Sequence, residues 1–285
     1  MRWLITGASG MVGADLEGAL RSRGEDVVAL SKADLDITDA TAVHAAVGAA
    51  KPQVLVNCAA YTKVDQAEAE ESVANAINGS AVEALASAAN AADALLTHVS
   101  TDFVFDGSST RPYEGNEPLA PLSAYGRSKR IGELGASQAR KHLIVRTAWL
   151  FGVNGPNFVE AIRNQIRKGT NPLRVVNDQR GRPTYTPHLA TALIRLSQLA
   201  VQSEVARGIV HYADEGEATW FDFATAIVEE TGAPIEVRPV TTAEFPRPAK
   251  RPAYSVLSTE RYERLTGAKP ESWREGLREY LTLKP

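Results

Sequence analysis

A tyrosine and a lysine four residues apart, Tyr125 and Lys129, have the spacing in this sequence that best suits proton transfer. On a helix this spacing puts both side chains on one face, where the ammonium group makes the phenol a better acid. The same spacing recurs at Tyr280 and Lys284, near the end of the chain, where no neighbouring motif indicates chemistry. The elements around each pair must therefore decide which one reacts.

A glycine-rich segment follows the first apolar run of the chain. Residues 2–6 read as a short strand, and after the glycines the apolar residues recur at helical spacing. A strand, a glycine turn and a helix in this order bind the diphosphate of a dinucleotide, because phosphates can approach the glycine backbone and the free N–H groups of the helix start. The predicted contacts are Gly7, Gly10, Met11, Val12 and Gly13.

Apolar runs alternate with helical segments through residues 1–150. Strands are predicted at residues 26–30, 53–57, 95–100 and 142–146, with helices between them. This alternation predicts an α/β fold, a Rossmann-like doubly wound parallel sheet whose ligands bind beyond the carboxyl ends of the strands. Residues 151–285 follow a looser pattern. They are expected to form mainly a smaller C-terminal α/β substrate lobe, with some segments returning to the first domain.

The order of glycine turn, Ser/Thr at the end of the fourth strand and Tyr-x-x-x-Lys helix resembles that of the extended short-chain dehydrogenase/reductases. The loops resemble more narrowly those of the dTDP-4-dehydrorhamnose reductase family, over essentially the whole chain. The segments that carry this resemblance are residues 34–38 (DLDIT), 57–65 (NCAAYTKVD), 100–107 (STDFVFDG), 146–152 (RTAWLFG), 177–179 (NDQ) and 251–257 (RPAYSVL).

The resemblance implies a reaction and the residues that perform it. The family reduces the carbon 4 ketone of dTDP-4-dehydro-L-rhamnose with a hydride from a nicotinamide. Tyr125 matches the proton donor, Lys129 the cation that stabilises the phenolate and holds the nicotinamide ribose, and Thr101 a hydrogen-bond partner of the ketone oxygen. The alternatives are a reductase or epimerase of another nucleotide sugar, and a non-catalytic NADP-binding regulatory subunit.

Further contacts are expected in the loops beyond the strands. Ser31-Lys32 ends the second strand without an acidic residue for a ribose 2′-hydroxyl, which favours NADPH, with NADH as an accepted alternative. The other cofactor contacts are Ser31, Asp36, Ile37, Ala59, Ala60 and Thr62. The substrate contacts, beside Thr101 and Tyr125, are Val64, Asp102, Phe103, Trp149, Gln179, Arg182, Thr184 and Arg251.

The composition narrows the class of partner. The 285 residues are 44% hydrophobic and 23% charged, and the formal net charge of −3 includes no long block of one sign. We therefore expect a nucleotide-sugar partner, no nucleic acid and no membrane, and a monomer or homodimer. Cys58 is the only cysteine, which excludes an internal disulfide. No export signal or long apolar run is apparent, and we expect a cytoplasmic enzyme.

A metal site is not expected. Some members of the family hold magnesium at a dimer contact through acidic residues, and Asp15 is a candidate for one of these ligands. The later loop, residues 186–188, reads Thr-Pro-His without a carboxylate.

Overall fold

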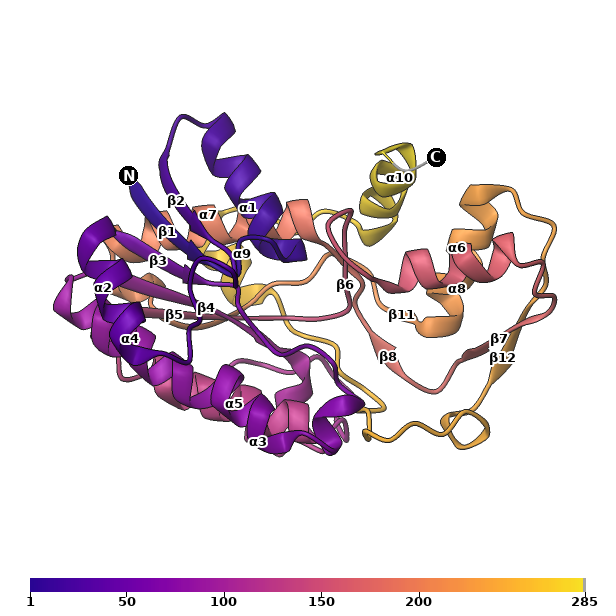
Figure 1. Cartoon of the computed structure of the whole chain (residues 1–285). Coiled ribbons are helices and arrows are strands. Elements are labelled where there is room, and N and C mark those ends of the chain that lie inside the picture. Colours follow the sequence, from indigo (N-terminus) through magenta and orange to yellow (C-terminus); the bar gives the residue numbers. More distant parts are fainter. Residues whose placement is uncertain (284–285) are drawn as a thin grey trace.

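The structure is a computed structural model, which describes residues 1–283, so Lys284 of the second tyrosine–lysine pair lies outside the described residues. Its centre is a six-stranded sheet in the order β10-β5-β4-β3-β1-β2, and every neighbouring pair is parallel (Figure 1). The strands are β1 (Arg2–Thr6), β2 (Asp26–Leu30), β3 (Val54–Asn57), β4 (Leu95–Thr101), β5 (His142–Thr147) and β10 (Gly208–His211).

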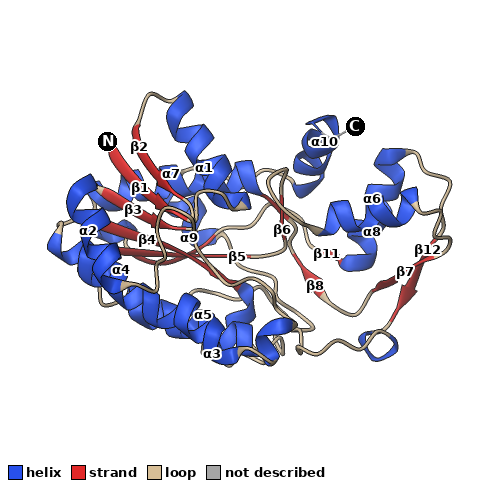
Figure 2. Ribbon diagram, in the orientation of Figure 1, coloured by secondary structure: helices blue, strands red, loops and turns tan. Residues whose placement is uncertain are grey.

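Helices cover both faces of this sheet (Figure 2). The apolar side chains of α1 (Met11–Ser22), α7 (Thr186–Gln202) and α9 (Glu260–Thr266) share one core with the strands. Those of α2 (Ala40–Ala50), α4 (Ala81–Ala91) and the end of α5 (Ala124–Ala136) share the other. The strands are buried apolar runs because helices pack on both sides of them. The predicted doubly wound parallel sheet is therefore confirmed.

The winding of the chain reverses between β1 and β3. The chain passes from β1 to β2 on one side and then places β3 on the other side of β1. Such a reversal leaves a crevice outside the carboxyl ends of the two strands, which is where open α/β sheets bind ligands. The glycine turn after β1 and the small residues after β3 both lie at this crevice.

A smaller lobe lies at one end of the molecule, away from the six-stranded sheet (Figure 1). It contains α6 (Phe158–Arg167), α8 (Trp220–Thr231) and α10 (Trp273–Leu283) around a core rich in aromatic side chains. Its strands pair as β7 (Leu173–Val176) with β12 (Val237–Val240) and β8 (Arg180–Gly181) with β11 (Ala218–Thr219), while β6 (Leu150–Phe151) pairs with β9 (Thr184–Tyr185). Two elements that lie between these segments in the sequence belong to the first domain: α7 packs on the six-stranded sheet, and β10 is its edge strand.

Tyr280 belongs to the core of this lobe. Its side chain is fully buried against Phe151, and its hydroxyl donates to Glu160 at 2.7 Å. Tyr280 therefore packs inside the smaller lobe, whereas Tyr125 lies near the carboxyl ends of the strands.

Short helical turns complete the structure. They are η1 (Gln66–Glu68), α3 (Glu71–Asn75), the π-turn η2 (Ala76–Ser80), η3 (Asp102–Val104), η4 (Glu204–Ala206) and η5 (Thr242–Glu244). Within residues 1–283, no helix is both long and apolar enough to span a membrane.

Candidate active site

The glycine turn between β1 and α1 is too tightly packed for side chains. Gly7 has a φ of +70°, and a Cβ placed there would lie 2.6 Å from the backbone of Ala59. A Cβ on Gly13 would lie 2.3 Å from the Gly7 carbonyl oxygen. Gly10, the N-cap of α1, has no side chain that could satisfy the free N–H groups at the helix start, where Met11 and Val12 follow. The turn therefore offers an open helix N-terminus to an anion such as a diphosphate.

The end of β2 contains an acidic group that the sequence pattern does not predict. The carboxylate of Asp34 accepts hydrogen bonds from the backbone N–H of Ser31, at 2.9 Å, and from its hydroxyl, at 2.6 Å. The expectation that no acid lies at this point is therefore wrong. Asp34 follows β2 by four residues, and the turn brings its carboxylate back to the strand end. The signal that could have predicted it is the Ser-x-x-Asp spacing, since Ser and Asp favour local bonds of this kind.

The two neighbouring cofactor candidates differ in where their side chains lie. Asp36 is exposed and accepts hydrogen bonds from the backbone and hydroxyl of Thr38, and the hydroxyl bond is the larger cause of its lowered pKa. Ile37 is buried in the core that contains α2 and α4. Asp36 therefore remains at the surface beside the crevice, while Ile37 anchors the turn.

Small half-buried residues follow β3. Cys58 pairs with the end of β1 through its N–H and the Thr6 carbonyl, and Asn57 accepts from the Thr6 hydroxyl at 2.7 Å and from the Ala59 N–H at 3.2 Å. These bonds fix the backbone on which Ala59 and Ala60 stand. Thr62 and Val64 lie in the loop that follows, exposed and half-buried respectively. The side chains at this side of the crevice are therefore small enough for a cofactor to lie over them.

Thr101 and Tyr125 meet beyond the end of β4. Thr101 is the last residue of β4, and Tyr125 is the second residue of α5, whose start is capped by the Ser123 hydroxyl. The helix approaches η3 closely, since a Cβ on Gly126 would lie 2.3 Å from the Phe103 carbonyl oxygen. The rings of Phe103 and Tyr125 meet edge to face at 5.6 Å. This packing places the Tyr125 hydroxyl close to Thr101.

A buried carboxylate, Asp102, lies next to these hydroxyls. It is 1% exposed and accepts a hydrogen bond from the Thr101 hydroxyl at 2.9 Å. Burial raises the pKa of Asp102 to about 6. Burial and the charge of Asp102 also raise the pKa of Tyr125 to about 12, although the nearby Thr101 hydroxyl opposes them. Tyr125 is therefore protonated at neutral pH.

Lys129 is buried one helical turn after Tyr125. Its ammonium group donates to the Val99 carbonyl at 2.7 Å and lies 3.4 Å from Nε2 of His98, so it rests against β4. Burial lowers its pKa to about 8. The pKa of Tyr125 is raised in this structure, opposite to the direction that the sequence predicts from Lys129, because burial disfavours the phenolate and the Lys129 ammonium group is turned towards β4.

The substrate candidates fall into two groups. Asp102 and Phe103 lie at the end of β4, and Trp149 follows β5 with a φ of +47°. Gln179 and Arg251 instead line a cavity of about 860 Å³ in the smaller lobe. The two groups are linked by Trp149, whose ring stacks on Trp220 of the cavity lining, and we treat them as two ends of one candidate site.

Arg182 and Thr184 do not line that cavity. Arg182 donates weakly to Thr259, at 3.5 Å, and lies in the field of Glu217. Thr184 is buried in β9, where its N–H donates to the Trp149 carbonyl at 3.2 Å. The substrate contacts of these two residues stay predictions, since in this structure Arg182, between β8 and β9, reaches Thr259 and Thr184 pairs with Trp149. Thr184 contacts the site only through the backbone of Trp149.

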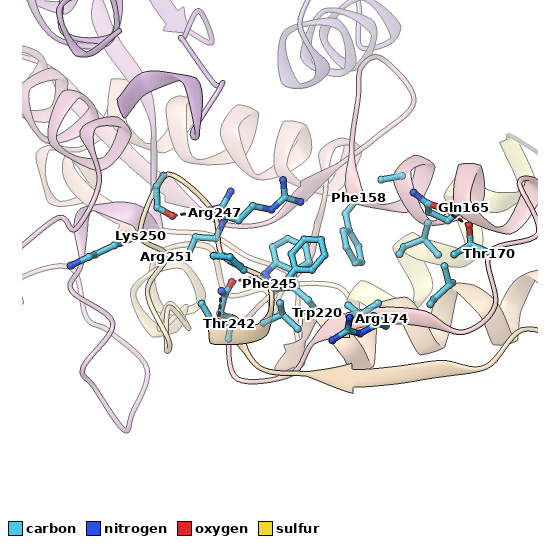
Figure 3. A pocket seen from close by; sticks show the side chains of 18 of the residues that line it. Phe158, Gln165, Thr170, Arg174, Trp220, Thr242, Phe245, Arg247, Lys250 and Arg251 are labelled. Atoms are coloured by element: carbon cyan, nitrogen blue, oxygen red, sulfur yellow. Dashed lines mark hydrogen bonds between the residues drawn. The ribbon is translucent and has the colours of Figure 1, made fainter. Parts of the chain in front are cut away.

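The cavity combines aromatic rings with cations (Figure 3). Phe158, Trp220 and Phe245 present their rings to it, and Arg247 and Lys250 lie towards the same end as Arg251. The sequence patterns do not single out Trp220, Phe245 or Arg247. The one available signal is the Pro- and Arg-rich run after residue 244, which is not helical.

The strap, residues 241–251, closes one side of this cavity. Its start is bound to the smaller lobe, where Thr242 donates to Asp178 from its hydroxyl at 2.6 Å. Its end is bound to the first domain, where Arg251 makes two bonds of 3.0 Å to the carboxylate of Asp65. Phe245, between these anchors, is 42% exposed. The strap is thus held at both ends by carboxylates.

The metal-ligand candidate Asp15 is engaged with protein groups. Its carboxylate accepts hydrogen bonds from the Thr186 hydroxyl and, at 3.0 Å, from the Asn154 amide. Among the residues that the structure describes, no group of three or more His, Cys, Asp or Glu side chains could hold a metal ion. Asp15 links α1 to the start of α7.

Comparison with known proteins gives a family for this arrangement. The family model described as "RmlD substrate binding domain" matches residues 1–284. A dTDP-4-dehydrorhamnose reductase of Streptomyces griseus is 44% identical over 283 residues, which cover 98% of this chain and 92% of that protein. A probable dTDP-4,6-dihydroxy-2-methyloxan-3-one 4-ketoreductase of Streptomyces antibioticus is also 44% identical, over 98% of this chain and 94% of its own.

Solved structures agree with the sequence relatives. The crystal structure of a dTDP-4-dehydrorhamnose reductase from Bacillus anthracis in complex with NADP superimposes with a TM-score of 0.93. It is 36% identical and covers 99% of both chains. The chain therefore belongs to the dTDP-4-dehydrorhamnose reductase family of the extended short-chain dehydrogenase/reductases, and it is an oxidoreductase of that family.

Proposed function

We propose that this protein reduces the 4-keto group of dTDP-4-dehydro-L-rhamnose to give dTDP-L-rhamnose, with NADPH as the reductant. The observation that carries the proposal is that α5, packed on Phe103, places Tyr125 close to Thr101 beyond the end of β4, on the same sheet edge as the glycine turn. A ketone held by these two hydroxyls lies within reach of a nicotinamide bound along the crevice.

The proton comes from Tyr125. NADPH supplies the hydride, which adds to carbon 4, and the former ketone oxygen gains negative charge as that bond forms. Tyr125 donates its proton to this oxygen, and the Thr101 hydroxyl, which donates to Asp102 in this structure, would turn its proton to the same oxygen. Because the pKa of Tyr125 is about 12, the phenol is fully protonated before the reaction. Lys129, close by on the same helix, stabilises the phenolate that the proton transfer leaves.

The residues at the crevice fit a dinucleotide. The close approaches at Gly7 and Gly13 leave only backbone at the turn, and the start of α1 has N–H groups without a side-chain cap. These groups would hold the diphosphate, Ala59 and Ala60 would lie under the cofactor, and Lys129 would hold the nicotinamide ribose. Ser31 and Asp34, at the end of β2, would lie beside the adenosine ribose, and NADH would be accepted as well.

The cavity of the smaller lobe suits the nucleoside diphosphate of the substrate. Its aromatic rings can stack on a base, and Arg247, Lys250 and Arg251 can pair with phosphate oxygens. Trp149 stacks on Trp220 of the cavity, while Asp102 and Phe103 are bonded to Thr101, and the sugar would lie between these two groups. The volume of about 860 Å³ is large enough for a ligand of this size.

A second candidate is the reduction of another dTDP-linked 4-keto sugar. The equally similar relative from Streptomyces antibioticus is named for such a substrate, and the reacting hydroxyls would serve either sugar. The experiment that decides is NADPH oxidation with dTDP-4-dehydro-L-rhamnose and with a panel of other 4-keto sugar nucleotides. We expect the highest kcat/KM with the first. A clearly higher kcat/KM with another sugar nucleotide would make that compound the substrate. Cofactor binding without turnover of any sugar would favour a regulatory subunit.

A further inference from the structure

Two tryptophans from different parts of the chain form a parallel stack next to the site. Trp149 directly follows β5, and Trp220 is the first residue of α8 in the smaller lobe. Their ring centroids are 3.6 Å apart, and the ring planes differ by 5°. Trp220 also lines the cavity, with Phe158 4.6 Å away. The stack therefore joins the sugar end of the site to the nucleotide end.

The backbone of Trp149 needs external support. Its φ of +47° lies in the left-handed region, which a bulky side chain rarely adopts and which persists only when the surroundings hold it. One backbone contact helps: the Trp149 carbonyl accepts from the Thr184 N–H at 3.2 Å. The ring itself lies against Gly181, where a Cβ would come within 2.5 Å of the indole, against the cluster that contains Phe105, and against Trp220, which covers it with a parallel ring.

Trp220 is itself fixed more firmly than a stacking partner requires. Its indole N–H donates to the Gln179 side chain at 3.2 Å, and that amide donates in turn to Thr242 of the strap at 2.9 Å. A reciprocal capping box between Thr219 and Asp222 holds the start of α8, where Trp220 stands. Gln179 therefore orients the Trp220 ring through this hydrogen bond.

We propose that Trp220 is a positioning residue, which holds Trp149 in its left-handed conformation and so sets the wall against which the reacting sugar lies. The inference rests on the proposed function, in which Trp149 borders the sugar. It assigns to Trp220 a task distinct from any direct contact with the nucleotide. If Trp220 acts through Trp149, its removal has no additional effect once Trp149 is gone.

A double-mutant cycle tests this dependence. The variants are Trp149→Phe, Trp220→Leu and the double variant, with kcat/KM measured for dTDP-4-dehydro-L-rhamnose. We expect each single change to lower kcat/KM by about threefold to tenfold, mostly through a higher KM. The kcat/KM of the double variant should be no lower than that of the less active single variant. Trp220→Phe, which keeps an aromatic ring, should recover most of the loss. Effects that multiply in the double variant would overturn the inference.

A spectroscopic signal reports the stack independently of turnover. Two indoles in parallel contact give an exciton couplet in the far-ultraviolet circular dichroism, which either Trp149→Phe or Trp220→Phe should abolish. Trp273→Phe is the matched control, because Trp273 is buried in the same lobe against Phe223 and should affect stability without changing the couplet or KM. Loss of the couplet in Trp220→Leu with unchanged kinetics would also overturn the inference. An inactive wild-type enzyme would instead refute the proposed function, and the inference with it.

Discussion

The two ends of the candidate site are built in different ways. The reacting end consists of segments that directly follow parallel strands or begin the helices beside them, and backbone contacts such as Gly7 with Ala59 fix it. The cavity end consists of α6, α8 and the strap, which side-chain contacts such as Asp65 with Arg251 hold together. The sheet thus provides rigid geometry for chemistry, while the smaller lobe provides surfaces that can vary with the substrate.

The two ends also differ in their charges. At the reacting end, burial raises the pKa of Asp102 and lowers that of Lys129, so both groups are held in unfavourable surroundings. At the cavity end, Asp178 is stabilised, because hydrogen bonds from Thr242 outweigh its partial burial and lower its pKa. Perturbed groups of the first kind are typical of sites that perform acid–base chemistry. Variants at the two ends should therefore behave differently.

The largest difference is expected for Tyr125→Phe. This change removes the proposed proton donor and should lower kcat by about 10²-fold to 10⁴-fold, while the affinity for NADPH stays within about twofold. Steady-state kinetics and cofactor titration measure the two quantities. Tyr280→Phe is the matched control: it removes a hydroxyl from the core of the smaller lobe, where it donates to Glu160, and should leave kcat unchanged. A Tyr125→Phe enzyme that keeps its activity would contradict the assignment of Tyr125 as the proton donor.

Asp102→Asn should stabilise the fold at neutral pH. The folded-state pKa of about 6 lies above the ordinary aspartate pKa of 3.8, so the ionised form costs about 3 kcal/mol above pH 6. This cost is absent below the unfolded pKa and develops as pH rises through the two values. The gain in the free energy of unfolding of the variant should therefore be up to about 3 kcal/mol at pH 7.5 and shrink towards pH 4.

Asp178→Asn provides the contrast for that measurement. Its carboxylate has a lowered pKa, so its contribution to stability is present above the unfolded pKa and is lost as pH falls through the folded value. Urea unfolding at pH 7.5 should show a loss of stability for this variant. A loss for Asp102→Asn as well would show that the Asp102 carboxylate is better solvated than its burial indicates.

Asp65→Asn should weaken substrate binding without affecting chemistry. The change breaks the two bonds that orient Arg251, and it thereby releases the end of the strap. The KM for the nucleotide sugar should therefore rise about tenfold with kcat nearly unchanged. Glu244→Gln is the matched control, because its pair with Arg174 is exposed and should contribute little. A lower KM in Asp65→Asn would mean that the carboxylate competes with the diphosphate for Arg251.

The pH profile of kcat/KM should report Lys129. Its pKa of about 8 means that the free enzyme loses the ammonium charge as pH rises, and the neutral amine cannot stabilise the phenolate. We expect kcat/KM to fall about tenfold per pH unit above pH 8, and to fall later in Lys129→Arg if that enzyme is active, since arginine stays protonated. A profile that is flat up to pH 10 would contradict this role.

The smallest effect is expected at the end of β2. Asp34→Asn removes a negative charge beside Ser31, where the ribose 2′-phosphate of NADPH would approach. The ratio of kcat/KM with NADPH to that with NADH should rise about threefold, because the group is exposed and its field is screened. An unchanged ratio would place the 2′-phosphate away from Asp34.

The reacting end could be predicted from sequence because each part of it is local. A glycine turn after a strand, Thr101 at a strand end and Tyr125 before Lys129 on one helix are patterns within short segments, and parallel strands bring their ends together. The fold order and the family motifs follow from the same local signals. The position of Lys129 against β4 could not be predicted, because it depends on burial that only the packed structure shows.

The cavity end could not be predicted in the same way. The Asp65–Arg251 pair joins residues 186 positions apart, and the stack of Trp149 with Trp220 joins two lobes. Arg182 shows the same dependence: its place in a polar loop predicts a phosphate contact, while its weak bond to Thr259 joins residues 77 positions apart. Such contacts arise from tertiary packing and have no periodic or spacing signal in the sequence.

The most direct test of the central claim is the fate of the hydride. The enzyme would be supplied with NADPH deuterated at the transferable position of nicotinamide C4 and with dTDP-4-dehydro-L-rhamnose, and the product would be examined by mass spectrometry and NMR. The proposed reaction predicts one deuterium on carbon 4 of dTDP-L-rhamnose. Deuterium at any other carbon, or an unlabelled product, would contradict it.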